Sequence, residues 1–184
     1  MSEAVAWLAL RAATQPAHAV LEAVPLNRRL FADDFSAAEL ADLLSRMASI
    51  YRPLEARLAA CEPALTLDYR RRLPLLLDGL SALGVAPPPA EAPIPLLEGE
   101  ASCWGALYVV EGSTMGGQMI HRQLAARHPA AALGFFLPHG DQAGENWRRF
   151  RTRLEVALGR PEALDQAIAA AIATFQLFDR ALSA

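Results

Sequence analysis

A histidine and a glutamate near the N-terminus have the spacing that a metal-binding imidazole requires. His18 and Glu22 are one turn apart in a helix, so their side chains project from the same face. A carboxylate there can hold one ring nitrogen and leave the other free to bind iron or zinc, although a surface pair is the more common use of this spacing. Arg11 lies two turns before His18 on nearly the same stripe. Its guanidinium group could bind the carboxylate of a flat anionic ligand, or the side chain could simply be solvated.

A second unusual segment is a stretch of helical pattern that contains Gly105, Gly112, Gly116 and Gly117. Each glycine inside a helix costs roughly 1 kcal/mol relative to alanine. At about 100° per residue, the first three fall on one stripe that lacks side chains. Close packing against another helix is the commoner cause of such a stripe, and a large flat ligand against the backbone is the alternative. The doublet Gly116-Gly117 favours the ligand, because adjacent glycines also let a helix kink.

The composition excludes several classes of function. The chain has 184 residues, 53% of them apolar, which is enough for one compact domain with its own core. Its 20 acidic and 17 basic residues leave a net charge of −3, which argues against nucleic-acid binding. All the basic residues are arginine, so a lysine Schiff base and a Walker-type phosphate loop are both excluded.

The cysteines and the N-terminus point to the cytoplasm. Cys61 and Cys103 lie far apart and form no CxxC motif, so we expect neither a zinc site nor a disulfide bond. Free thiols would suit a reducing cytoplasm. The first ten residues contain no basic segment, and no apolar run approaches the roughly 18 residues of a membrane span, so no targeting segment is expected.

The elements that must position these residues are helices. Apolar residues recur at helical spacing, no stretch alternates as a strand would, and the proline-rich segment 86–95 indicates a loop. Ser36 and Glu39 form a capping-box pattern, Gly84 predicts a helix end, and Pro161 has a favoured early helical position. The expected fold is an all-α, single-domain bundle with helices near 5–24, 36–60 (bent at Pro53), 67–83, 99–127, 141–158 and 161–182.

Together, two of these segments resemble the signature helices of bacterial haem oxygenases of the biliverdin-producing branch. The first segment holds Leu10-Arg11, Ala13-Thr14, His18 and Leu21-Glu22, and the second is Leu107-Tyr108-Val109-Val110-Glu111-Gly112-Ser113-Thr114-Met115-Gly116-Gly117. The similarity extends over residues 1–184 and includes Phe135-Phe136, Trp147-Arg148-Arg149-Phe150 and Ala173-Thr174-Phe175 with Phe178. The resemblance implies one haem oxygenase-like domain.

The resemblance implies roles for the residues of the first helix and of the glycine segment. His18 corresponds to the proximal haem ligand, Glu22 to its hydrogen-bonding partner and Arg11 to a basic residue near a haem propionate. The glycines at 112, 116 and 117 correspond to the distal helix over the open face of the haem. Ser113 stands where animal members have the aspartate that anchors a catalytic water network, so the anchor is either Ser113 or a backbone carbonyl group.

Further residues correspond less closely to family positions. Arg148, Arg149 and Arg151 lie where the family places more propionate-binding bases, and Met115 is a candidate haem contact. The remaining histidines, His121, His128 and His139, are interpreted as structural or solvated.

The reaction that the resemblance implies is the oxygen-dependent opening of haem b, both cofactor and substrate, to biliverdin, carbon monoxide and ferrous iron. The electrons must come from outside, because the chain has no flavin or nicotinamide motif. The resemblance, and no residue of the chain, implies O2 as the oxidant and a ferredoxin or flavoprotein reductase as the electron donor. A bacterial phytochrome is a possible acceptor of the product. A haem carrier on the same fold that releases haem intact, and a helical protein that binds no haem, are the alternatives.

Overall fold

The computed structural model describes residues 5–61, 69–89, 93–95 and 97–183, and in these ranges the chain forms helices and no strands. The predicted all-α fold is therefore confirmed. None of the helices in the described ranges is both long and apolar enough to cross a membrane. The α-helices are α1 (Val5–Ala23), α2 (Pro25–Arg29), α3 (Ala37–Leu58), α5 (Leu73–Ala82), α6 (Gly99–Leu124), α7 (Ala143–Ala157) and α8 (Pro161–Ser183), and the 3-10 helices are η1 (Ala130–Phe136) and η2 (Gly140–Gln142).

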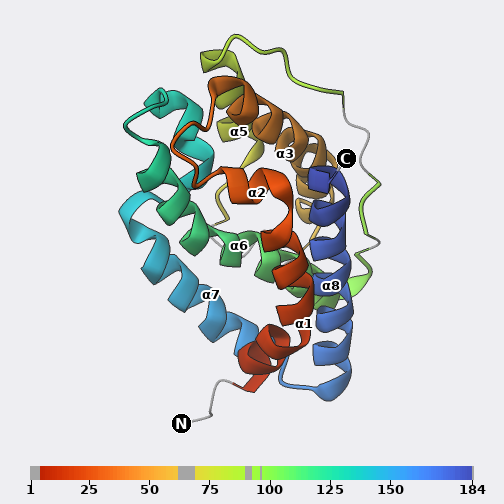
Figure 1. Ribbon diagram of the computed structural model, residues 1–184. Coiled ribbons are helices and arrows are strands. Elements are labelled where there is room, and N and C mark those ends of the chain that lie inside the picture. Colours follow the sequence, from red (N-terminus) through yellow and green to blue (C-terminus); the bar gives the residue numbers. More distant parts are fainter. Residues whose placement is uncertain (1–4, 62–68, 90–92, 96, 184) are drawn as a thin grey trace.

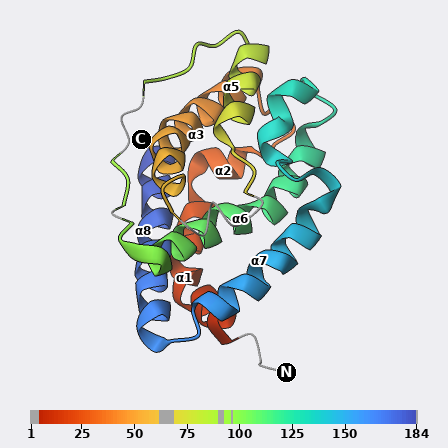
Figure 2. The ribbon, with the colours of Figure 1, turned by 180° about the vertical axis from the view of Figure 1, so that it is seen from behind.

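The helices surround α6, which runs through the middle of the molecule. Figures 1 and 2 show α1 and α8 side by side along one edge, α7 along the opposite edge, and α3 with α5 at one end. α6 packs against α8, α7 and η1, and α1 packs against α8. The two segments that carry the candidate site residues, α1 and α6, are therefore held in one bundle by α8.

The predicted helix boundaries follow from local hydrogen bonding. The Ser36 hydroxyl group accepts a hydrogen bond from the Glu39 N–H group, and the Glu39 carboxylate accepts one from the Ser36 N–H group, so the capping box is confirmed. Gly84 has a φ of 71°, a value that favours glycine. The N–H group of Val85 then donates to the carbonyl group of Leu80, which ends α5 as predicted.

The largest differences from the prediction are the start of α5 and the presence of α2. The predicted helix 67–83 begins at Leu73, because Pro74 fits only the first turn of a helix; residues 67 and 68 lie outside the described residues. The short helix α2 was not predicted, although Pro25 at its first position is a recognised start signal. α3 is one helix that contains Pro53.

Gly105 explains how closely α6 approaches α8. A Cβ atom at Gly105 would lie 2.1 Å from the carbonyl oxygen of Ala167 in α8. Ala167 and the neighbouring Ala171 are also fully buried, so both helices present small residues to each other. At this position the glycine stripe serves helix packing.

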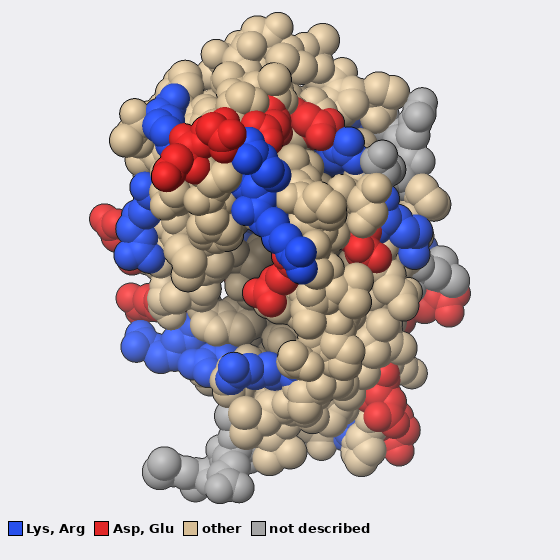
Figure 3. Space-filling model, viewed as in Figure 1, with Lys and Arg blue, Asp and Glu red and all other residues tan. Residues whose placement is uncertain are grey.

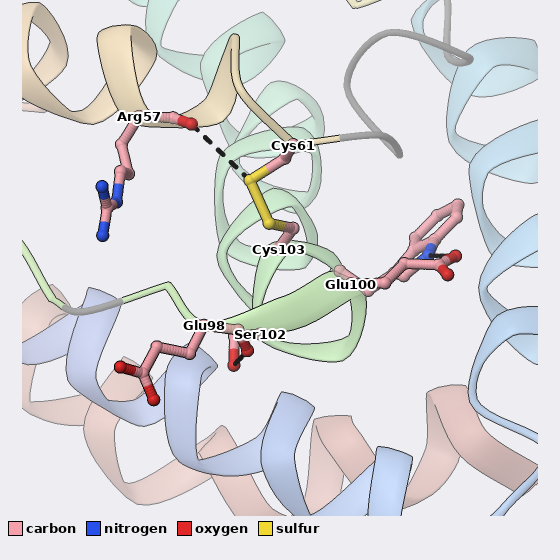
Figure 4. The surroundings of a disulfide bond; sticks show 7 residues. Arg57, Cys61, Glu98, Glu100, Ser102 and Cys103 are labelled. Atoms are coloured by element: carbon pink, nitrogen blue, oxygen red, sulfur yellow. Dashed lines mark hydrogen bonds between the residues drawn. A yellow bond between two sulfur atoms is a disulfide. The ribbon is translucent and has the colours of Figure 1, made fainter.

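The expectation that Cys61 and Cys103 are free thiols is wrong, because the two residues form a disulfide bond (Figure 4). Cys61 follows the end of α3 and Cys103 lies in the second turn of α6, with Cα atoms 6.1 Å apart. Spacing along the chain gives no information on this distance, since the two helices meet only in the folded protein. The bond joins the two helices across a sequence separation of 42 residues.

We predict that reducing this disulfide bond lowers the free energy of unfolding by roughly 4 kcal/mol, because a loop of this length restricts the unfolded chain. Urea unfolding with and without a phosphine reductant measures the change. The double variant Cys61→Ala/Cys103→Ala is the control and should not respond to the reductant. Equal unfolding midpoints of the wild-type protein under both conditions would contradict the prediction.

Candidate functional site

A cavity of about 680 Å3 lies between α1 and α6 and is closed on its inner side by α3 and α8. Figure 3 shows it as a hollow in the surface, with basic side chains along one rim, over α1 and α7. Its volume lies within the range typical of small-molecule and cofactor sites. The predicted site residues that line this cavity are Arg11, His18, Glu22, Gly112, Ser113, Gly116 and Gly117.

His18 is presented to the cavity by the buried stripe of α1. Leu10 and Thr14 are buried on the same stripe, and His18 follows Thr14 after one turn. The imidazole Nδ1 atom lies 3.5 Å from a carboxylate oxygen of Glu22, and the ring edge packs against Phe175. With Nδ1 facing Glu22, Nε2 is the ring nitrogen left to bind a ligand.

α6 forms the wall of the cavity where Gly112 and Gly116 lie. A Cβ atom at Gly116 would meet no atom within 4 Å, and one at Gly112 would make an ordinary contact with the ring of Trp147. Gly117 differs, since a Cβ atom there would lie 2.6 Å from the carbonyl oxygen of Phe136 in η1. Helix packing therefore requires Gly105 and Gly117, whereas Gly112 and Gly116 leave the wall open.

Gly117 nevertheless lines the cavity, and so does Ser113. The Ser113 hydroxyl group donates a hydrogen bond to the carbonyl group of Val110, 2.8 Å away in its own helix. The proton of this hydroxyl group is thus already used inside α6. The Tyr51 hydroxyl group is a second hydrogen-bond neighbour of the Ser113 side chain.

The predicted arginines do not all lie at the cavity. Arg11 lines it, and Arg28, which sequence reasoning did not single out, lines it too. The guanidinium groups of Arg11 and Arg151 both lie against the ring of Trp7, at 5.6 and 4.6 Å from its centroid. Arg151 therefore lies beside the cavity without lining it.

Three other predicted contacts lie outside the cavity lining. Arg148 is paired with Glu145 at 3.6 Å on the exposed face of α7. Arg149 borders a second, water-sized cavity of about 50 Å3. Met115 is 44% exposed on α6, and Met119, one turn later, is the methionine of this helix that reaches the cavity. The roles predicted for these residues stay predictions.

Sequence analysis missed a buried polar cluster at the inner end of the cavity. Arg72, which is only 1% exposed, lines the cavity and donates from Nη2 to Oε1 of Glu111 at 2.9 Å. The other carboxylate oxygen of Glu111 lies 3.0 Å from Nε2 of His139. Glu55, also buried, accepts hydrogen bonds from the Arg72 N–H group and from the Tyr69 hydroxyl group. A signal was present, because Glu111 is a charged residue directly after the buried pair Val109-Val110.

Electrostatics keep Glu111 ionised. Burial is the largest single influence and raises the pKa of its carboxyl group, but the hydrogen bonds and charges of His139 and Arg72 together outweigh it, so the pKa lies below that of an ordinary glutamate. Glu111 is thus an acceptor for both neighbours, and Nε2 of His139 is the donor. Burial raises the pKa values of the Tyr51 and Tyr69 hydroxyl groups, so both remain neutral.

The fold and the cavity define a helical protein in which one open imidazole nitrogen shares a cavity with two glycines of α6, Gly112 and Gly116. A family model described as "Heme oxygenase" matches residues 97–184, which include α6, α7 and α8. A protein of Xanthomonas campestris pv. campestris (strain 8004) named "Heme oxygenase" is 44% identical over 125 residues, which are 64% of this chain and 70% of that protein. The chain belongs to the haem oxygenase family. His18 lies outside the residues that the family model matches.

Proposed function

We propose that this protein is a haem oxygenase, which uses O2 and electrons from a separate donor to cleave haem to biliverdin, carbon monoxide and ferrous iron. The observation that carries the proposal is the cavity of about 680 Å3 in which His18 and the glycines of α6 line one space. A haem b molecule is flat, largely apolar and charged at one edge. The apolar lining, the arginines and the open imidazole nitrogen suit these three properties.

His18 is the proposed iron ligand. Glu22, with a carboxylate oxygen 3.5 Å from Nδ1, fixes the tautomer that leaves Nε2 unprotonated. A neutral imidazole is a weaker electron donor than a thiolate and does not strongly favour cleavage of the O–O bond. Arg11, and Arg28 on α2, are the proposed partners of the negatively charged propionate groups, since both line the cavity.

The proposed distal wall consists of Gly112, Gly116 and the backbone between them. Because a Cβ atom at Gly116 would have open space around it, this part of the wall would leave room for O2 and ordered water beside a bound haem. A bulky acid-base side chain at this point would favour peroxidase-like chemistry instead. The absence of side chains at these two positions is therefore what the proposed reaction requires of this helix.

The proposal extends to partners and location. A reduced ferredoxin or a flavoprotein reductase supplies the electrons, and a bacterial phytochrome is a proposed acceptor of biliverdin. Residues 1–184 act as one haem oxygenase-like domain in the cytoplasm, where such electron donors work. The disulfide bond between Cys61 and Cys103 is unusual for a reducing compartment, and both residues are buried away from soluble reductants.

Hemin titration followed by reduction in air tests this function. We expect one equivalent of hemin to give the Soret band of a histidine-ligated haem. Addition of a ferredoxin, its reductase and NADPH should then replace this band with bilin absorbance, and a haemoglobin trap should detect carbon monoxide. A protein that binds hemin but keeps its Soret band would be a carrier, and one that takes up no hemin would refute both haem functions.

A further inference from the structure

We propose that Glu155 of α7 is a positioning residue that holds the first half of α1 in place, and that this contact slows the release of a haem bound in the cavity. The part that concerns haem rests on the proposed function. The contact itself joins two elements that are far apart in the sequence, since Glu155 lies 149 positions after Ala6.

The carboxylate of Glu155 caps the start of α1. One of its oxygens accepts a hydrogen bond from the N–H group of Ala6, and the other accepts one from the N–H group of Trp7, both at 2.9 Å. These N–H groups belong to the first turn of α1, where backbone donors have no partner within the helix. This turn has no acidic residue of its own, so the negative charge that stabilises a helix N-terminus comes from α7. Figures 1 and 2 show the start of α1 and the end of α7 together at one end of the bundle.

The position of Glu155 is unfavourable for α7 itself. This helix ends at Ala157, so Glu155 lies in its last turn, where the negative end of the helix dipole disfavours an acidic side chain. The same turn has no basic residue that would offset the charge. The formation of α7 therefore gives no reason for a glutamate at this position, whereas the contact with α1 does.

The first half of α1 depends on outside contacts because Pro16 lies inside this helix. Proline has no N–H group, so the hydrogen bond from position 16 to the carbonyl group of Ala12 is missing. The residues before Pro16 are thus joined less firmly to the half that carries His18. Packing against α8 holds one face of the first half, and Glu155 holds its first turn.

The first half of α1 also forms part of the cavity wall. Trp7 and Arg11 line the cavity, and the guanidinium group of Arg151 on α7 lies over the ring of Trp7, 4.6 Å from its centroid. Movement of the first turn away from α7 would break this cation–π contact and widen the cavity between the two helices. Loss of the Glu155 carboxylate should therefore ease the escape of a flat ligand.

Hydrogen exchange of the apoprotein, followed by mass spectrometry of its peptides, tests the contact without any haem. We expect Glu155→Leu to speed amide exchange in residues 5–15 by at least about 5-fold, because the first turn loses its cap, and to leave exchange in α3 unchanged. Glu155→Gln keeps one acceptor oxygen but no charge, so its effect should be smaller. Glu145→Leu is the matched control, since Glu145 lies at the exposed start of the same helix and pairs with Arg148 there. It should exchange like the wild type.

Transfer of hemin to excess apomyoglobin measures the release of the ligand. We expect Glu155→Leu to release hemin at least about 5-fold faster than the wild type. The Soret band should not shift, since His18 is retained. Glu145→Leu should release hemin at the wild-type rate. Glu155→Gln, measured in both experiments, decides the outcome if Glu155→Leu does not fold.

The two experiments can overturn the inference in three ways. Unchanged exchange in residues 5–15 would show that Glu155 does not hold α1. Faster exchange there with unchanged hemin release would show that the contact does not retain the ligand. Faster exchange in α3 as well would indicate a general loss of stability in place of a positioning role.

Bilin formation separates this inference from the proposed function. Faster hemin release and faster exchange in residues 5–15, in a protein that forms no bilin, support the role of Glu155 and refute the oxygenase activity. Bilin formation by the wild type, with unchanged hemin release in the Glu155 variants, refutes the role of Glu155 alone. A wild-type protein that takes up no hemin refutes both the proposed function and the control of haem release.

Discussion

Replacing His18 with alanine should abolish normal haem ligation and lower the rate of bilin formation by at least about 100-fold, since loss of a supporting contact to a ligand alone costs 10–100-fold. The His18 side chain is 55% exposed and contacts Glu22 and the edge of Phe175, so its removal leaves the core of the bundle intact. Circular dichroism should therefore show unchanged helix content. The absorption spectrum of the hemin complex and the initial rate of bilin formation are the measurements.

A histidine on the glycine helix provides the matched control. His121 lies on α6 beyond the glycine segment and does not line the cavity, so His121→Ala should keep the wild-type spectrum and rate. Glu22→Gln, which keeps the shape of the partner of His18 but removes its charge, should lie between the two, with a 10–100-fold loss. A His18→Ala protein that binds hemin with the wild-type spectrum would refute the assignment of the ligand.

The helices were predictable because their signals are local. The capping box at Ser36 and Glu39, the glycine with positive φ at position 84 and Pro161 in a first turn each depend on hydrogen bonds within a few residues. The same holds for His18 and Glu22, whose proximity needs only one helical turn. Sequence reasoning is strongest where the partners lie on the same element.

Contacts between distant segments were not predictable in this way. The disulfide bond between Cys61 and Cys103 depends on how the end of α3 meets the start of α6. The pairing of Arg72 with Glu111 joins residues 39 positions apart, and the adjacent residues Arg70 and Arg71 offered equally plausible partners. Nothing in the local pattern distinguishes these three arginines, and only the packing of the segment before α5 against α6 selects one of them.

The glycine segment of α6 was predictable in its local pattern but not in its contacts with distant segments. Helical periodicity correctly placed Gly105, Gly112 and Gly116 on one stripe, but this stripe extends past different neighbours along α6. At Gly105 the neighbour is the backbone of α8, whereas at Gly116 the stripe faces open space. Helix packing and a ligand surface were treated as alternative causes for the whole segment, and the structure assigns packing to Gly105 and Gly117 and an open wall to Gly112 and Gly116.

Because Gly116 faces open space in the cavity, we expect Gly116→Leu to lower hemin affinity and the rate of bilin formation by at least about 10-fold while the apoprotein stays folded. Gly116 lines the cavity, so a leucine side chain at this position would compete with the proposed ligand for space. Its Cβ atom would meet no atom within 4 Å, so the backbone of the apoprotein can accept the side chain. Leucine is a better helix former than glycine by about 0.8 kcal/mol, so the apoprotein should be at least as stable as the wild type. Urea unfolding of the apoprotein, Soret titration with hemin and bilin formation measure the three quantities.

Gly144→Leu is the matched control, because Gly144 lies in a helix, has no atom within 4 Å of its Cβ position and does not line the cavity. The control should bind and cleave haem like the wild type. Gly112→Ala provides an intermediate case, since its Cβ atom would make an ordinary contact with Trp147 at 3.5 Å and fill little of the cavity. A Gly116→Leu protein with wild-type affinity and turnover would mean that the open side of α6 is not the surface that faces the haem, and the proposed distal wall would then have to be sought elsewhere in the lining.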